Sequence, residues 1–326
     1  MRRRSFLATA AATGMAPGLV RPARADAWPS RPIKLVAPFA PGGGSDFTSR
    51  LIAEKLSARL GQTMLVDNKP GEGGNLGAEF AIKAPADGYT FLTISGSYAI
   101  NSILHSPSFD SLNDIVAIGQ FTDEPTVLVV NPSVPARNLA DLFALCRRDP
   151  GKLTFGSSGP GGLVHLGTEF ALEAGGVKAT HVPYRGTAPA LNDLVAGQID
   201  IILDQTSNSI SQVRAGTIRA YAVTDAKRVE QAADIPTTDQ AGLPGFHMTL
   251  WSGLWAPKGT PKEVIAKLNR AALDALNDPS VRTKLENLGL QMTPADQLSP
   301  QALGTLQKAE IEKWWPMIRA ANVKAE

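Results

Sequence analysis

The chain has 326 residues, of which 43% are apolar, 6% aromatic and 19% charged, and its formal net charge is +2 at pH 7. These values are typical of a globular protein, and a chain of this length usually forms more than one lobe or domain. No basic patch or stripe suited to a nucleic acid partner occurs beyond the N-terminus. A single cysteine, Cys146, excludes an internal disulfide.

The first 25 residues are typical of an export signal. Arg2, Arg3 and Arg4 precede a short, weakly apolar run to Val20, and a small-x-small site predicts cleavage after Ala25. The paired arginines resemble the twin-arginine pattern, but Arg2 stands where Ser or Thr is usual, so Sec export stays open. The run is too short to remain as a membrane span. Without this signal, 27 basic and 30 acidic residues remain, a net charge of −3, and we expect the mature protein in the periplasm.

Residues 33–50, IKLVAPFAPGGGSDFTSR, carry the first ligand-binding pattern. Residues 33–37 are typical of a buried strand, and the apolar residues of 46–60 fall near one face of a helix. Three glycines between them would let the backbone approach a ligand, and the helix start offers unpaired N–H groups and a positive dipole end. Neither the Walker pattern nor the GxGxxG spacing is present. The segment predicts a cradle for an anion, with a glycine-rich turn that binds nothing as the alternative.

Strand-like and helix-like segments alternate along the rest of the chain, which indicates α/β sheets covered on both faces. The predicted strands are 64–66, 89–94, 116–118, 126–130, 153–155, 180–182, 199–203 and 219–223, and the predicted helices are 75–83, 139–147, 164–174, 188–195, 210–215 and 262–276. Extended stretches at 121–129 and 221–226 are the expected hinge crossings. We therefore predict that lobe one comprises residues 26–124 and 225–326, and that lobe two comprises residues 125–224.

Further loops rich in small residues follow predicted strands. Residues 71–75 (GEGGN) and 95–98 (SGSY) belong to lobe one, whereas 156–162 (GSSGPGG) belongs to lobe two and leads into the helix that carries His165. Open α/β sheets bind ligands at loops of this kind, which follow the carboxyl ends of parallel strands. Such loops on both lobes predict a cleft that closes around an anion from two sides.

The sequence supports an enzymatic function less well than it supports a ligand-binding cleft. Pro160 stands where the GxSxG nucleophile motif needs its last glycine, and His165, His181 and His247 lack the spacing of metal ligands. Asp204, at the end of an apolar strand, would serve as a general base, brace neighbouring loop amides or orient a polar ligand group. The sequence leaves these roles of Asp204 open. We expect no catalytic activity, no metal and no cofactor.

The chain resembles the Bug family, the solute-binding proteins of tripartite tricarboxylate transporters. Ordered segments over almost all of the mature chain carry this resemblance: PFAPGGGSDFTSR at 38–50, VDNKPGEGGNLGAEFAIKAPADGYTFL at 66–92, GKLTFGSSGPGGLVHLGTE at 151–169, HVPYRGTAPALNDLVAGQIDIILD at 181–204 and WSGLWAPKGTPKEVIAKLN at 251–269. The resemblance implies a two-lobed α/β fold like that of class II periplasmic binding proteins, with two doubly wound domains joined by a two-strand hinge. Members of the family bind small carboxylates and deliver them to a membrane permease of one large and one small subunit.

The expected site combines loops from both lobes. Backbone N–H groups of 42–45 would hold a carboxylate, Phe39 would pack on its carbon skeleton, and Asp46 would cap the helix. Relatives often have Ser or Thr at Gly162 and Lys at Arg185, and a ligand contact by Arg185 stays open. The predicted ligand-binding residues are Phe39, Pro41, Gly42, Gly43, Gly44, Ser45, Asp46, Gly74, Ser95, Ser157, Ser158, Gly159, Gly161, Gly162, His165, Tyr184, Thr187 and Asp204.

The function expected from the residues and the resemblance is that of a periplasmic receptor. We expect a monomer that closes two lobes on a small organic carboxylate and hands it to the permease subunits. A ligand sensor that presents its closed form to a membrane signalling protein is the alternative, and a carboxylate-processing enzyme is a third. Recognition of a ligand by backbone groups leaves no side-chain signature of the particular acid.

Overall fold

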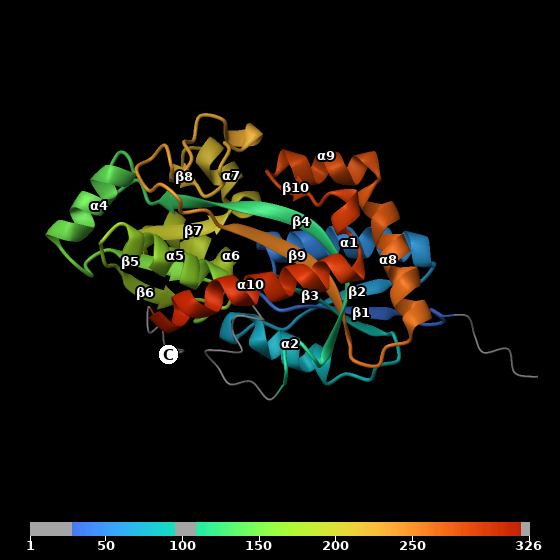
Figure 1. Cartoon of the computed structure of the whole chain (residues 1–326). Coiled ribbons are helices and arrows are strands. Elements are labelled where there is room, and N and C mark those ends of the chain that lie inside the picture. The colour runs from blue at the N-terminus through green and yellow to red at the C-terminus, as the bar shows by residue number, and fades with distance from the viewer. Residues whose placement is uncertain (1–27, 95–108, 321–326) are drawn as a thin grey trace, which may run out of the picture.

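The computed structural model describes residues 28–94 and 109–320 (Figure 1). The predicted export signal, its cleavage site after Ala25, and Ser95 lie outside these ranges. The strands are β1 (Ile33–Ala37), β2 (Met64–Asn68), β3 (Thr90–Ile94), β4 (Ile115–Val130), β5 (Thr154–Ser157), β6 (Thr180–Pro183), β7 (Ile201–Gln205), β8 (Arg219–Val223), β9 (Thr249–Pro257) and β10 (Gln291–Met292). The α-helices are α1 (Gly44–Leu60), α2 (Asn75–Ile82), α4 (Leu139–Arg148), α5 (Leu163–Ala174), α6 (Thr187–Val195), α7 (Thr206–Arg214), α8 (Lys262–Leu276), α9 (Pro279–Asn287) and α10 (Pro300–Ala320). Within the described ranges, no helix is long and apolar enough to cross a membrane.

Lobe one is built on the sheet order β2-β1-β3-β9-β4, with β10 also paired to β4. Strands β1, β2 and β3 are parallel, whereas β9 runs antiparallel to both β3 and β4. Strand β1 is buried on both faces. Leu35 packs into a core shared with Ile52 of α1 and Leu268 of α8, and Val36 packs into a second core with Ala78 of α2. Helices therefore cover both faces of this sheet, as continuous apolar strands require.

Lobe two is built on the sheet order β6-β5-β7-β4, and β8 pairs with β4 as well. Strands β5, β6 and β7 are parallel, and β4 is antiparallel to β7 and β8. Its core contains Phe155 and Ile202 from the sheet, with Leu166 of α5 and Leu194 of α6 packed on them. Lobe two is thus a second α/β unit, which confirms the two-lobed α/β fold predicted from the sequence.

Strand β4 passes from one lobe to the other without a break. Its residues 115–125 pair with β9, and its residues 126–130 pair with β7. The return crossing leads into β9, where the backbone N–H of Met248 donates to Thr224 O and the hydroxyl of Thr224 lies 2.8 Å from that of Thr126. Two adjacent extended segments thus connect the lobes, a geometry suited to hinge motion.

The C-terminal helix α10 is a third connection between the lobes. It runs along both in Figure 1, and its Trp314 ring stacks on Phe170 of α5 at 5.7 Å between centroids.

The core of lobe two also contains Val229 and Met248, which lie beyond residue 224. The lobe boundaries at residues 124/125 and 224/225 stay predictions.

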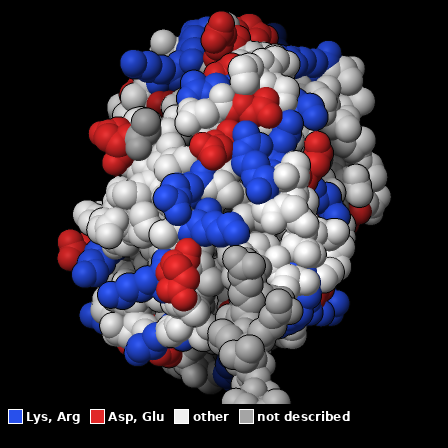
Figure 2. Space-filling view, turned by 90° about the vertical axis from the view of Figure 1, so that its right-hand side faces the viewer, with Lys and Arg blue, Asp and Glu red and all other residues white. Residues whose placement is uncertain are grey.

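Several predicted elements differ from the structure. The strands predicted at 116–118 and 126–130 are parts of one long strand, β4, and the helix predicted at 210–215 begins earlier, at Thr206. Strands β9 and β10 and helices α9 and α10 were not predicted. Figure 2 views the right-hand side of Figure 1, where lobe one lies, and shows Lys and Arg interspersed with Asp and Glu. Surface ion pairs such as Arg31–Asp87 and Lys34–Asp67 belong to this lobe.

Candidate functional site

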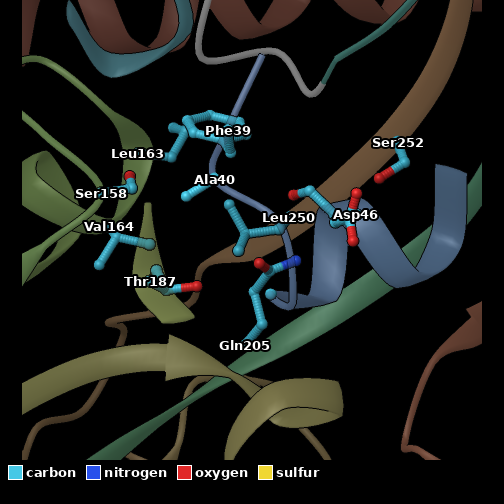
Figure 3. Close-up of a pocket in the computed structure, with 12 residues that line it drawn as sticks. Phe39, Ala40, Asp46, Ser158, Leu163, Val164, Thr187, Gln205, Leu250 and Ser252 are labelled. Carbon is cyan, nitrogen blue, oxygen red and sulfur yellow. The ribbon is translucent and has the colours of Figure 1, made fainter. Parts of the chain in front are cut away.

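A cavity of about 480 Å³, its open mouth included, lies between the two lobes (Figure 3). Lobe one, including its strand β9, contributes one wall, and lobe two contributes the other. The lining residues are Phe39, Ala40, Gly43, Ser45, Asp46, Ser158, Leu163, Val164, Thr187, Gln205, Leu250 and Ser252.

Helix α1 begins at the cavity with its N-terminal N–H groups uncapped. Its N-cap residue is Gly43, which has no side chain to accept a hydrogen bond from the first turn. The preceding turn needs a positive φ at Gly42, which is 91°, a conformation that glycine adopts without a Cβ clash. The first N–H groups of a helix carry partial positive charge. This end of α1 can therefore receive a carboxylate.

Asp46 does not cap α1, so that part of the expected site is wrong. Its Oδ2 accepts hydrogen bonds from Gly42 N at 3.0 Å and Arg50 Nε at 2.9 Å, and its Oδ1 accepts one from Asn68 Nδ2 at 2.9 Å. Burial alone would raise the pKa of Asp46, but these hydrogen bonds outweigh burial and lower it. Asp46 stays ionised and holds the glycine turn through its hydrogen bond from Gly42 N.

Two helices of lobe two also begin on the cavity wall without side-chain caps. Leu163 and Val164 form the first turn of α5, and Thr187 is the first residue of α6. Helix α7 begins there too, after Gln205, but its Ser207 N–H donates to Glu124. The uncapped starts of α1, α5 and α6 thus meet at one cavity, because each follows the carboxyl end of a parallel strand. Such an arrangement favours an anion.

The serine loop of lobe two, residues 157–162, is held from behind by two histidines. Ser157 Oγ lies 2.7 Å from His181 Nε2, and Gly161 N donates to His165 Nδ1 at 3.1 Å. The two imidazole rings stack with centroids 4.0 Å apart. Burial lowers the pKa of His165 to about 3 and that of His181 to about 4. Both rings are therefore neutral at pH 7, and they brace the loop rather than face the cavity.

Five of the wall residues have apolar side chains. Phe39, Ala40 and Leu250 face Leu163 and Val164 across the space in Figure 3. Such a surface suits the carbon skeleton of an organic ligand and provides burial energy that a purely polar site would lack.

The structure brings six of the predicted residues to the cavity wall and leaves the others behind it or beside it. On the wall are Phe39, Gly43, Ser45, Asp46, Ser158 and Thr187. Pro41 and Gly42 are exposed at the turn, and Gly74 leaves room for the Phe39 ring, because a Cβ there would lie 3.3 Å from Phe39 Cζ. Off the wall are also Gly44, Ser157, Gly159, Gly161, Gly162, His165, Tyr184 and Asp204.

Asp204 and Tyr184 have partners inside lobe two. Asp204 is fully buried, and its Oδ2 accepts from Asn208 Nδ2 at 2.7 Å and from Ser209 Oγ at 2.5 Å. Burial raises the pKa of Asp204 to about 6. The Tyr184 hydroxyl donates to Asp193 Oδ2 at 2.7 Å. Each of these side chains stabilises a loop that forms the site. Arg185 has an exposed side chain and is absent from the wall.

Six wall residues were missed by sequence reasoning: Ala40, Leu163, Val164, Gln205, Leu250 and Ser252. Gln205 directly follows Asp204 at the carboxyl end of β7, so the strand-end rule that selected Asp204 also applies to Gln205. Leu250 and Ser252 lie on β9, which was not predicted as a strand.

The fold and site together define a two-lobed receptor of the periplasmic-binding-protein class. The model of the family described as "Tripartite tricarboxylate transporter family receptor" matches residues 48–323. The chain therefore belongs to this family, as the resemblance to Bug proteins indicated.

Three solved structures are similar over nearly the whole chain. The periplasmic binding protein BugD is 34% identical, with a TM-score of 0.88, over 92% of this chain and 100% of BugD. A protein of R. palustris with adipate is 36% identical, with a TM-score of 0.86, over 91% of this chain and 99% of that one. MatC from Rhodopseudomonas palustris with bound malate is 32% identical, with a TM-score of 0.85, over 88% of this chain and 98% of MatC.

Proposed function

We propose that this protein is an exported receptor that captures a small organic carboxylate between its lobes and delivers it to a tripartite tricarboxylate-type permease. The observation that carries the proposal is the meeting of the uncapped starts of α1, α5 and α6 at one cavity whose wall is partly apolar. The adipate and malate in two relatives support the same ligand class.

In this proposal, one carboxylate of the ligand accepts hydrogen bonds from the N–H groups of Gly43 and Ser45, which both lie on the cavity wall. The carbon skeleton lies against Phe39 and Leu163, and the N-terminal turns of α5 and α6 complete the anion site from lobe two. Closure about the two extended crossings then shifts the population toward the form that a permease recognises. The receptor acts as a monomer without catalysing a reaction.

The test is a thermal-shift and native mass spectrometry screen of the mature chain. The panel contains succinate, glutarate, adipate, malate, citrate and benzoate, and the matched controls are the neutral amides of the same acids. Ligand at about a hundredfold excess over its Kd stabilises the folded state by about 2.7 kcal/mol. We expect stabilisation by at least one acid and none by its amide. Equal stabilisation by acid and amide, or by no acid at all, would refute carboxylate binding.

Delivery and export need separate measurements. We expect deletion of this gene to abolish uptake of the captured acid in cells that retain the permease subunits. N-terminal sequencing of the protein from the periplasm should begin at Asp26, after cleavage behind Ala25. Replacement of Arg3 and Arg4 by Lys should leave the precursor in the cytoplasm, and normal processing in a strain without twin-arginine transport would indicate Sec export instead.

A further inference from the structure

Glu124 and Gln205 form a buried pair at the point where β4 changes its partner. Glu124 is opposite Leu250 of β9, and two residues later Thr126 is opposite Gln205 of β7. Glu124 is 3% exposed, and its Oε2 accepts a hydrogen bond from Gln205 Nε2 at 2.9 Å. The pair therefore connects the inter-lobe strand to a residue of the cavity wall.

The contacts of Glu124 determine which end of the Gln205 amide faces the cavity. Glu124 Oε1 accepts from the backbone N–H of Ser207 at 2.6 Å and from Thr206 Oγ1 at 3.3 Å. An ionised carboxylate accepts hydrogen bonds and cannot donate them, so the amide NH₂ of Gln205 must face Oε2. The Gln205 oxygen then points away from Glu124, and Figure 3 shows it on the side of the cavity where Thr187 and Val164 lie.

The amide oxygen of Gln205 is an acceptor that cannot change its role. Serine and threonine hydroxyls on the wall rotate and can donate or accept, and the oxygens of Asp46 already have partners. No hydrogen bond from any described residue reaches Gln205 Oε1. When a ligand excludes water from the cavity, this oxygen loses a partner unless the ligand supplies a donor.

We propose that Gln205, oriented by Glu124, selects carboxylates that carry a hydroxyl group, and that Glu124 is a positioning residue for this selection. The inference rests on the proposed carboxylate-binding function and narrows its ligand class to hydroxy acids. A plain dicarboxylate leaves the amide oxygen without a donor, and a 2-oxo acid places a second acceptor near it. Sites built to bond a hydroxyl discriminate strongly against analogues that lack one.

The test compares matched acids that differ at one carbon atom. These are the plain, 2-hydroxy and 2-oxo forms of the C4, C5 and C6 dicarboxylates, measured by calorimetry at pH 8. Burial raises the pKa of Glu124 to about 7, so this pH keeps it ionised. For the wild type, we expect the 2-hydroxy acid to bind roughly 10- to 100-fold more tightly than its plain and 2-oxo analogues, the range that one unpaired buried acceptor costs.

The variant Glu124→Gln should reverse the amide. Its new side-chain oxygen must accept from Ser207 N, so its NH₂ faces residue 205, and the Gln205 oxygen turns toward it. The amide NH₂ of Gln205 then faces the cavity. The ratio of the affinity for the 2-hydroxy acid to that for the 2-oxo acid should fall to about one or below. Thr206→Val is the matched control, because it removes a Glu124 contact without changing the amide direction, and it should keep the wild-type ratio.

Gln205→Leu provides a second route should Glu124→Gln fail to fold. This variant removes the acceptor, so the affinities for the plain, 2-hydroxy and 2-oxo acids should lie within about threefold of one another. A wild-type ratio near one, or an unchanged ratio in Glu124→Gln, would overturn the proposal while carboxylate binding itself stands. If no acid of the panel binds, the proposed function fails first.

Discussion

The backbone N–H of Ala40 donates a hydrogen bond to the carbonyl oxygen of Arg185 at 3.0 Å, across the cleft between the lobes. Ala40 follows β1 in lobe one, and Arg185 follows β6 in lobe two. Close by, a Cβ on Gly159 would lie only 3.1 Å from Gly73 N of lobe one. The two lobes thus touch through backbone groups at the edge of the cavity, which is the geometry of a closed cleft.

Gly186→Ala should interfere with closure. A Cβ at Gly186 would lie 3.0 Å from Ala40 N and 3.3 Å from Ala40 Cβ, so the lobes could not approach as far. We expect at least tenfold weaker binding of the best carboxylate of the panel, and less compaction on its addition in small-angle scattering.

Gly216→Ala is the control for backbone strain at Gly186. Gly216 also has a positive φ, 73°, but a Cβ there would meet nothing within 4 Å. It should lose roughly 1–2 kcal/mol of stability and keep its affinity. Equal effects of the two variants on affinity would show that the Ala40–Arg185 contact is unimportant for binding.

Ser45→Asp should separate helix stability from ligand affinity. Ser45 is the second residue of α1 and lies on the cavity wall. An aspartate there stabilises the helix by roughly 0.3–1 kcal/mol through the dipole, but it repels a bound carboxylate. We expect an unchanged or higher melting temperature without ligand and at least tenfold weaker binding by calorimetry. Ser45→Asn, which has the same shape without the charge, should bind within about threefold of the wild type; retained affinity in Ser45→Asp would remove the start of α1 from the site.

The fold could be predicted from the sequence wherever the pattern is local. Alternating apolar strands and helices predicted the two α/β lobes, because each segment carries its own periodicity. The pattern failed at β4, where Gly119 and Pro125 interrupt the apolar run although the strand continues by changing partners from β9 to β7. It also failed for α10, whose Pro316 and mixed polarity obscure a helix that packs across both lobes.

The site was predictable only in part, for a related reason. Glycine-rich loops can be recognised in a sequence, because backbone freedom is a property of the glycine residues themselves. Gly43 and Ser45 were therefore predicted as site residues. The sequence does not tell which side of a strand end faces the ligand, so Asp204 was chosen and its neighbour Gln205 was missed. Leu250 and Val164 look like core residues, and only the closed fold turns them toward the cavity.

The buried Glu124 should make stability depend on pH. Burial raises its pKa from 4.5 to about 7. Between these values the folded protein keeps the proton and the unfolded chain loses it. The contribution to the free energy of unfolding is therefore complete below about pH 4.5 and disappears as the pH rises to about 7, with a size of roughly 3 kcal/mol.

The pH dependence of Glu124 is measured as a difference between proteins. His165 and His181, with lowered pKa values, act in the opposite sense at neighbouring pH, so the wild-type curve alone is ambiguous. Urea unfolding of the wild type and Glu124→Gln without ligand, from pH 4 to 8, isolates the carboxyl group. We expect the variant to gain stability relative to the wild type as the pH rises. A difference that stays constant with pH would mean that Glu124 is ionised throughout.

Asp204→Ala should weaken the fold more than it weakens binding. The change leaves Asn208 Nδ2 and Ser209 Oγ without their acceptor inside lobe two. A buried donor that loses its partner costs roughly 1–3 kcal/mol, so the melting temperature without ligand should fall. Because Asp204 is absent from the cavity wall, the affinity for the best carboxylate should change less than threefold.

Gln205→Leu is the comparison for Asp204→Ala, because the two residues are adjacent on β7 but only Gln205 lies on the wall. Melting curves with and without ligand separate the two roles. Loss of a residue that only braces the fold lowers the melting temperature both with and without ligand and preserves the ligand-induced difference. Loss of a residue that contacts the ligand reduces that difference. We expect the first pattern for Asp204→Ala and the second for Gln205→Leu with the hydroxy acid. If Asp204→Ala keeps its melting temperature and loses affinity, Asp204 contacts the ligand directly, and the cavity described here is too small.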